Sequence, residues 1–248
     1  MSARFGDKLV LVTGAAAGLG RATVLRFAAE GARVFGVDLD EAGLDETRGL
    51  CAPGAFTALT ADLRTAAGCR DVVASAIAQG GGLDVLCNVA GINRFHHFLE
   101  MSEDDWQTIL SVNLSAVAFL CQAALPHLIE RRGCIVNVGS IASLKGQPYT
   151  AAYSASKGGL ALLTRSLAIE FADTPVRINM VAPGGMETPM NQKMQFPAGI
   201  DWKKLKPLTR YGMAAPEEVA DVIAFLASAA AARVHGAIWS VDGGASAG

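Results

Sequence analysis

The sequence predicts an α/β protein with one doubly wound parallel sheet of about seven strands and helices on both faces. Short apolar runs alternate with longer segments of helical pattern, and this alternation is typical of βαβ units in a parallel sheet. Hydrophobic residues make up 51% of the chain and charged residues only 18%, so the composition can supply a sheet that is buried on both faces. The length of 248 residues fits a single domain, 1–248, of this class.

The first half of the chain is expected to form four strands and three helices. Its first apolar run is unbroken, and Gly31 ends the helix after it. Strands are predicted at 8–13, 33–38, 56–61 and 85–88, and helices at 21–30, 40–50 and 66–79.

The second half continues the alternation. Ser102 is a predicted N-cap with acids in the first turn after it, and Pro216 fits the first position of a helix. Helices are predicted after Ser102 and at 114–130, 150–171 and 216–228, and strands at 134–138, 176–181 and 237–241. The irregular segment 189–213 is long for a compact domain, and such segments are usually functional, so we expect a substrate lid there.

Charge and composition exclude several classes of protein. The net charge of −2 and the pI of 6.1 do not indicate the excess positive charge that binds nucleic acid or an anionic membrane. The N-terminus has no apolar signal region, and no apolar stretch is expected to reach the roughly 20 residues that span a bilayer. Five cysteines without a Cys-x-x-Cys indicate neither a disulfide framework nor a zinc site. We therefore expect a cytoplasmic protein without a metal.

A glycine-rich turn comes directly after the first predicted strand. Gly14, Gly18 and Gly20 allow the backbone to turn sharply and to approach a pyrophosphate. The next helix offers free N–H groups and the positive end of its dipole. A glycine-rich turn alone can be purely structural, but its place between strand and helix favours nucleotide binding.

Asp38 ends the second predicted strand. A carboxylate at this position can accept hydrogen bonds from both hydroxyls of an adenosine ribose, and it would repel a 2′-phosphate. Neither Leu39 and Asp40 nor the alanines of the glycine turn supply a compensating cation. The sequence therefore predicts NAD(H) rather than NADP(H).

Tyr153 and Lys157 are four residues apart in a predicted helix, so they share one face. A free tyrosine has a pKa of about 10 and is a poor base near neutral pH. A fixed positive charge nearby favours the phenolate, and we expect Lys157 to lower the pKa of Tyr153. Such a pair can exchange a proton with an alcohol or ketone.

Together these motifs resemble a short-chain dehydrogenase/reductase. The resemblance covers nearly the whole chain, and its parts occur in family order: the Thr-Gly-x-x-x-Gly-x-Gly turn, an Asn-x-Ala-Gly, a serine, Tyr-x-x-x-Lys and a late Pro-Gly. It implies a Rossmann-type fold that transfers a hydride between a nicotinamide cofactor and a secondary alcohol or ketone. One departure is Val89, which stands where the family has a second asparagine; it puts a structural hydrogen bond in question.

The resemblance also implies a set of site residues. The catalytic set is Asn113, Ser140, Tyr153 and Lys157. Tyr153 is the acid/base, Ser140 orients the substrate oxygen, Lys157 also contacts the nicotinamide ribose, and Asn113 holds a water that extends the proton path. Asp62 is expected to meet the adenine amine. The cofactor-binding set is Gly14, Ala17, Gly18, Leu19, Gly20, Asp38, Leu39, Asp62, Leu63, Asn88, Ala90, Gly91, Tyr153, Lys157, Pro183, Gly184, Met186 and Thr188.

The substrate side is less defined. Ser140, His96, Tyr149 and Met190 are expected to contact or border the substrate, and the apolar lid favours an apolar or ring-bearing molecule of moderate size. An alternative activity is 3-oxoacyl-thioester reduction, whose enzymes share these motifs but mostly use NADPH. A protein that senses NAD without catalysis is a further alternative. The family also implies a homotetramer or homodimer.

Overall fold

The computed structural model describes residues 3–205 and 212–247 and contains a seven-stranded, all-parallel sheet. The strand order is β3-β2-β1-β4-β5-β6-β7, with β1 paired to both β2 and β4. Successive strands are therefore added toward one edge of the sheet from β1 to β3 and toward the other edge from β4 to β7, so the strand order switches at the β1/β4 pair. The predicted doubly wound Rossmann-type fold is confirmed.

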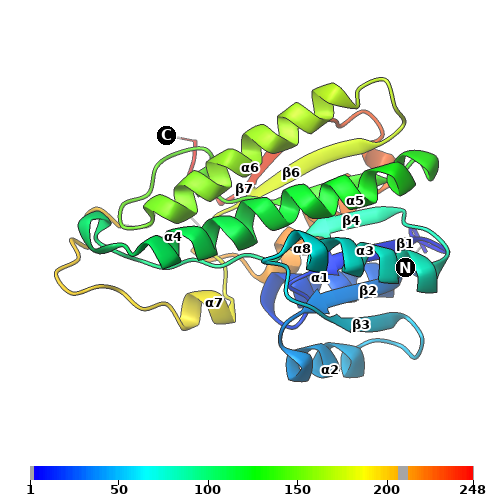
Figure 1. The fold of residues 1–248 in the computed structure, drawn as a ribbon, viewed down its shortest axis with the longest axis horizontal. Helices are drawn as coiled ribbons and strands as arrows, with labels where there is room; N and C mark the ends of the chain where they lie inside the picture. Colours follow the sequence, from blue (N-terminus) through cyan, green and yellow to red (C-terminus); the bar gives the residue numbers. More distant parts are fainter. Residues whose placement is uncertain (1–2, 206–211, 248) are drawn as a thin grey trace.

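The strands form the centre of the molecule (Figure 1). Every residue of β1, β4 and β5 is buried, because helices cover both faces of these strands. The strands are β1 (Leu9–Thr13), β2 (Arg33–Asp38), β3 (Phe56–Thr60), β4 (Val85–Asn88), β5 (Cys134–Val138), β6 (Arg177–Pro183) and β7 (Ile238–Val241).

Helices cover the two faces in separate groups. One apolar core joins the sheet to α3, α5 and α6, which run along the same side in Figure 1, and the other joins it to α1, α2 and α8. The helices are α1 (Gly18–Ala29), α2 (Glu41–Leu50), α3 (Ala66–Gly80), α4 (Glu103–Leu110), α5 (Ala116–Glu130), α6 (Ala151–Glu170), α7 (Pro189–Gln192) and α8 (Pro216–Ala227).

The predicted elements are all present, with three shifted boundaries that concern the site. Helix α1 begins at Gly18, three residues earlier than predicted, because two glycines belong to its first turn. Strand β6 continues to Pro183. The helix predicted at 114–130 is continuous with α4 through a π-helical segment, Ser111–Ser115, which a periodic pattern does not reveal.

One helix meets the length and composition of a membrane span, contrary to the expectation from sequence. The continuous helix Glu103–Glu130 has a mean hydropathy of 1.7 over its most apolar window, and 44% of that window is buried. Within the sheet-and-helix core, α5 packs on α3 and β4. A core helix of an α/β domain passes the same test, so the finding is weak evidence for a membrane.

The lid predicted near 189–213 is described in part. Its first section contains the short helix α7, and its backbone runs over the loop after β4. Residues 206–211 lie outside the described part of the chain. Met186 and Ala214 form an isolated bridge that joins the two ends of this segment.

Candidate active site

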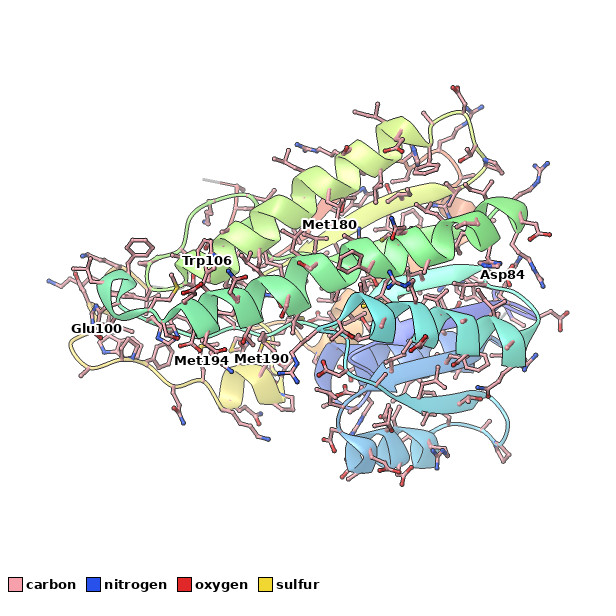
Figure 2. All side chains as sticks on the ribbon, viewed as in Figure 1. Asp84, Glu100, Trp106, Met180, Met190 and Met194 are labelled. Carbon is pink, nitrogen blue, oxygen red and sulfur yellow. The ribbon has the colours of Figure 1, made fainter. Side chains whose placement is uncertain are left out.

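The candidate site lies at the carboxyl ends of the central strands. β1 leads there into the glycine turn, β5 into Ser140, and β6 into Gly184. Figure 2 shows Met190 and Met194 of the lid toward one end of the molecule and Asp84, which precedes β4, at the opposite end. A cleft of about 250 Å³ here is lined by the glycine turn, the start of the lid, Tyr153 and Lys157. This edge is where open α/β sheets bind ligands.

The glycine turn fits a phosphate-bearing cofactor. Gly14 and Gly18 have φ of +72° and +50°, which favour glycine, and a Cβ on Gly20 would lie 1.8 Å from the carbonyl oxygen of Gly14. The N-cap, Ala17, supplies no side-chain acceptor to the first turn of α1. The N–H groups of that turn are therefore available to a pyrophosphate, as in other dinucleotide sites.

Asp38 lies beside this turn with its carboxylate held in place. Oδ2 accepts from the N–H of Ala16 at 3.1 Å, and Oδ1 accepts from the N–H of Leu39 at 2.8 Å. The nearby guanidinium of Arg21 is directed instead to Glu46, at 2.7 Å. Among the described residues Asp38 has no ion-pair partner. The carboxylate is therefore free to accept from a sugar.

Asp62 has a different environment from the one that the resemblance implies. Its carboxylate pairs with the Arg64 guanidinium at 2.5 Å and accepts from the Arg64 N–H at 2.9 Å. This hydrogen bonding lowers the pKa of Asp62. Asp62 is not the cap of α3 either, since Thr65 accepts from the Gly68 N–H. Asp62, Leu39 and Leu63 still line a cavity of about 180 Å³ beside Asp38.

Asn88 lies outside the lining of the cleft, and its contact with the cofactor stays a prediction. It is 1% exposed, and its Nδ2 donates to Asn137 Oδ1 at 2.8 Å, which joins β4 to β5. Asn137 in turn donates to Thr164 of α6. Pro183 is also buried and lies outside the lining of the cleft.

Val89, which stands where the family has a second asparagine, is held through its backbone and its apolar side chain. Its N–H and that of Ala90 both donate to Thr13 Oγ1 at 3.0 Å, and its side chain packs against the core under α1 and α8. Thr13 thus holds the end of β4 to the end of β1. Sequence reasoning missed this role of Thr13.

Most of the predicted cofactor residues do line the main cleft. They come from segments that are far apart in the sequence but meet at one edge of the sheet. They are Gly14, Ala17, Gly18, Leu19, Gly20, Asp38, Ala90, Gly91, Tyr153, Lys157, Gly184, Met186 and Thr188.

Tyr153 and Lys157 line the cleft, and the side chain of Ser140 lies within hydrogen-bonding reach of Tyr153. Helix α6 places Lys157 one turn after Tyr153, and the Lys157 Nζ lies 5.8 Å from the centre of the tyrosine ring. Lys157 is only 3% exposed and donates to the Val138 carbonyl at 2.7 Å. Ser140 comes shortly after β5, and its Oγ accepts from the Ala142 N–H at 3.1 Å. The three predicted catalytic side chains are thus brought together.

The expected effect of Lys157 on Tyr153 is wrong for this arrangement. Burial raises the pKa of Tyr153, and only a hydrogen bond with Ser140 opposes that rise. Burial also lowers the pKa of Lys157 from 10.5 to about 8. In both cases the main cause is that burial removes the charged form of the group from water.

Asn113 lies inside the π-helical segment and is fully buried. Its Oδ1 accepts from the Ile92 N–H at 2.8 Å, and its Nδ2 donates to the Ile92 carbonyl at 2.9 Å and to Ser156 Oγ at 3.1 Å. A Cβ on Gly91 would lie 3.3 Å from Asn113 Oδ1 and 3.4 Å from Lys157 Nζ. Asn113 therefore connects the loop after β4 to the catalytic helix.

The residues expected at the substrate differ in their positions. Met190 lines both the cleft and a neighbouring cavity of about 700 Å³ beneath the lid. His96 lines that cavity, but its Nε2 faces Asp105 Oδ2 at 3.4 Å.

Tyr149 lines neither cavity. Its backbone has φ of +65°, and its hydroxyl accepts from the N–H of Asp201 at 3.0 Å. Its phenol thus bonds the lid backbone, and the expected contact of Tyr149 with substrate stays a prediction.

Comparison with known proteins decides the family. A family model described as "Enoyl-(Acyl carrier protein) reductase" matches residues 14–246. The chain is 40% identical over 246 residues to the 3-oxoacyl-[acyl-carrier-protein] reductase FabG of Thermotoga maritima, covering 97% of this chain and 98% of that protein. The chain is a short-chain dehydrogenase/reductase.

Further relatives of this short-chain dehydrogenase/reductase act on different molecules. It is 38% identical to the meso-2,3-butanediol dehydrogenase of Serratia marcescens, over 98% of this chain and 96% of that protein. The crystal structure of a 3-ketoacyl-(acyl-carrier-protein) reductase from Brucella melitensis complexed with NADH matches with a TM-score of 0.90 at 30% identity, over 98% and 99% of the two chains. The chain is an oxidoreductase that acts on hydroxyl or keto groups, in agreement with the sequence-based prediction.

Proposed function

We propose that the protein is an NAD(H)-dependent dehydrogenase that interconverts a secondary alcohol and a ketone. The observation that carries the proposal is the single cleft in which the glycine turn, Asp38, Tyr153 and Lys157 meet. One end of the cleft suits a dinucleotide and the other suits proton exchange with a hydroxyl group.

The preference for NAD(H) rests on Asp38. Its carboxylate accepts from the backbone N–H groups of Ala16, Leu39 and Asp40 and makes no ion pair with the described residues, so a 2′-phosphate would meet unpaired negative charge. We expect kcat/KM with NADH to exceed that with NADPH, and Asp38→Ala to reduce this preference. A wild-type enzyme that favours NADPH contradicts this role of Asp38.

The catalytic roles are assigned from the geometry. The bound cofactor supplies the hydride acceptor or donor. Tyr153 exchanges the hydroxyl proton with the substrate, and Ser140 holds the same substrate oxygen by a hydrogen bond. Lys157 contributes its ammonium to the site and to the ribose of the cofactor, and Asn113 holds the loop that borders both.

The direct test is turnover of a panel of secondary alcohols and ketones, measured at the NADH absorbance. General acid–base help is worth about 10²–10⁴-fold, so Tyr153→Phe should lose at least this much in kcat while NADH binding persists. Ser154→Ala, on the next residue of α6, serves as the control because, among the described residues, the Ser154 hydroxyl bonds only to the hydroxyl of Thr150. Retention of most activity in Tyr153→Phe contradicts the mechanism.

Two other functions compete with this one. The likeness to acyl-carrier-protein reductases favours 3-oxoacyl thioesters as a second substrate class; faster turnover of an acetoacetyl thioester with NADPH would favour it. A protein that only senses NAD would bind NADH without turning over any member of the panel. The complete set of Asn113, Ser140, Tyr153 and Lys157 argues against that alternative.

We also propose a homodimer or homotetramer that works in the cytoplasm as a single domain, 1–248, with a lid near 189–213. An apolar groove between α5 and α6 is lined by Leu125, Ile129, Leu163 and Leu167, and on another face of α6 the side chain of Ile169 is 79% exposed. Covering such a surface favours association. Light scattering of the purified chain tests the assembly.

A further inference from the structure

Two hydrogen bonds hold the outer lid section, residues 195–205, to the body of the protein. His97 Nε2 lies 2.7 Å from the Ala198 carbonyl oxygen, and since a carbonyl only accepts, the imidazole is the donor. The Asp201 N–H donates to the Tyr149 hydroxyl at 3.0 Å. Among the described residues, no other hydrogen bond or ion pair joins the outer lid section to residues outside the lid. Two side chains therefore fix the direction of this part of the lid.

These two side chains also contact each other. The rings of His97 and Tyr149 meet edge to face, with their centroids 5.3 Å apart and their planes at 90°. The N–H of the neighbouring His96 donates to the Tyr149 carbonyl at 2.8 Å. The loop after β4 and the segment before α6 thus form one joined support for the lid, and both hydrogen-bonding groups are preorganised on it.

Tyr149 adopts a backbone conformation that a tyrosine disfavours. Its φ of +65° lies in the left-handed region, which a bulky side chain rarely enters. Strain of this kind persists only where the surrounding structure fixes it, and it is common at functional sites. Tyr149 lies four residues before Tyr153 in the chain. The phenol that bonds the lid and the phenol proposed as acid/base therefore come from one short segment.

A row of three aromatic rings extends the contact between the lid and the loop after β4. Phe95 packs on Phe196 with ring centroids 4.7 Å apart, and Phe196 packs on Trp202 at 4.9 Å. Phe95 lines the cavity beneath the lid, whereas Trp202 is 61% exposed. Stacked rings supply contact area but little direction, so the hydrogen bonds of His97 and Tyr149 set the position of the outer lid section.

We propose that Tyr149 and His97 form a latch that holds the lid over bound substrate, which makes Tyr149 a positioning residue for the reaction at Tyr153. This inference rests on the proposed dehydrogenase activity. Met190 and Met194 of the lid line the cavity beside the catalytic cleft, so a lid that stays in place retains the substrate there. The latch acts on this retention and touches no reacting group. Its loss should therefore change the KM for substrate rather than kcat.

The test removes one hydrogen bond at a time. Tyr149→Phe keeps the ring but loses the acceptor for the Asp201 N–H, and His97→Ala loses the donor to the Ala198 carbonyl. Each variant should raise the KM for the best alcohol or ketone of the panel by about 2- to 10-fold, which corresponds to one hydrogen bond. Both kcat and the KM for NADH should change by less than about twofold.

A conservative variant and a matched control complete the comparison. His97→Gln keeps an N–H donor at the end of a side chain and should retain more substrate affinity than His97→Ala. His127→Ala, on α5 and without a side-chain hydrogen bond among the described residues, should behave as the wild type. Hydrogen exchange of the substrate-free protein reports the latch without turnover. The Asp201 amide should exchange about 2- to 10-fold faster in Tyr149→Phe than in the wild type.

The outcomes separate this inference from the proposed function. An unchanged KM for substrate in both Tyr149→Phe and His97→Ala, or a loss confined to kcat, overturns the latch and leaves the dehydrogenase intact. A His97→Gln variant that binds substrate no better than His97→Ala overturns the role of the His97 hydrogen bond. If no alcohol or ketone is turned over, the proposed function fails. Faster exchange at Asp201 in Tyr149→Phe would then still support the latch, and unchanged exchange would overturn it.

Discussion

The buried ammonium of Lys157 should make the stability of the cofactor-free protein depend on pH in an unusual direction. The pKa of Lys157 falls from 10.5 to about 8 in the fold, and one pKa unit corresponds to ~1.4 kcal/mol. Holding the lysine protonated at pH 7 therefore costs the folded state about 3 kcal/mol. The side chain is 3% exposed, so solvent screens this cost little.

The direction of the pH effect is set by proton binding. Between pH 8 and pH 10.5 the unfolded chain binds the proton of this lysine more tightly than the folded chain, so stability rises with pH. The protonated Lys157 destabilises the fold fully well below pH 8, and this destabilisation decreases as the pH rises above 8. From pH 7 to pH 9 the relief amounts to roughly 1.4 kcal/mol.

The measurement is urea unfolding of wild type and Lys157→Met at pH 7 and pH 9, at one protein concentration. The wild type should gain roughly 1.4 kcal/mol relative to the variant between the two pH values. The pH-induced change in the free energy of unfolding is compared between wild type and variant. This comparison removes the effect of losing the bond to Val138 and the titration of all other groups, which both proteins share. Parallel pH profiles for the two proteins, or a wild type that loses stability relative to the variant, would show that the buried ammonium does not destabilise the fold.

Two further substitutions test what the backbone around the site requires. Gly20→Ala places a Cβ against the Gly14 carbonyl, so it should lower both the melting temperature and the affinity for NADH, measured by thermal unfolding and by fluorescence titration; unchanged NADH affinity would contradict the assigned role of the turn. Arg177 donates to the carbonyls of Leu226, Ala227, Ser228 and Ala231 at the end of α8. Arg177→Ala should therefore cost about 2–4 kcal/mol in urea unfolding with little change in kcat, because these contacts are remote from the cleft; a selective loss of kcat would contradict this.

The sheet and the cofactor end can be predicted from the sequence because their signals are local. A buried parallel strand is a continuous apolar run, and β2 and β5 have the predicted bounds for this reason. The glycine turn is likewise specified by residues that tolerate unusual backbone and close approach. Asp38 can be placed beside it because the end of a strand fixes where the next side chain lies.

The surroundings of several predicted site residues depend on tertiary contacts that the sequence does not show. The sequence predicts Asn88 at the cofactor, but only the register of β4 with β5 shows that it faces Asn137. It predicts Tyr149 at the substrate, but the contact of Tyr149 with Asp201 joins residues 52 apart in the chain.

The catalytic pair depends on a distortion that no sequence pattern announces. The segment Ser111–Ser115 is π-helical, and such segments place one extra residue in a turn and rotate the next turns relative to a regular α-helix. Asn113 lies in this turn and bonds both Ile92 and Ser156, whose hydroxyl donates to the Tyr153 carbonyl. The π-helical turn therefore connects the loop after β4 to α6 through Asn113. A buried amide suits this position because its oxygen can accept from the Ile92 N–H while its NH₂ donates to Ser156.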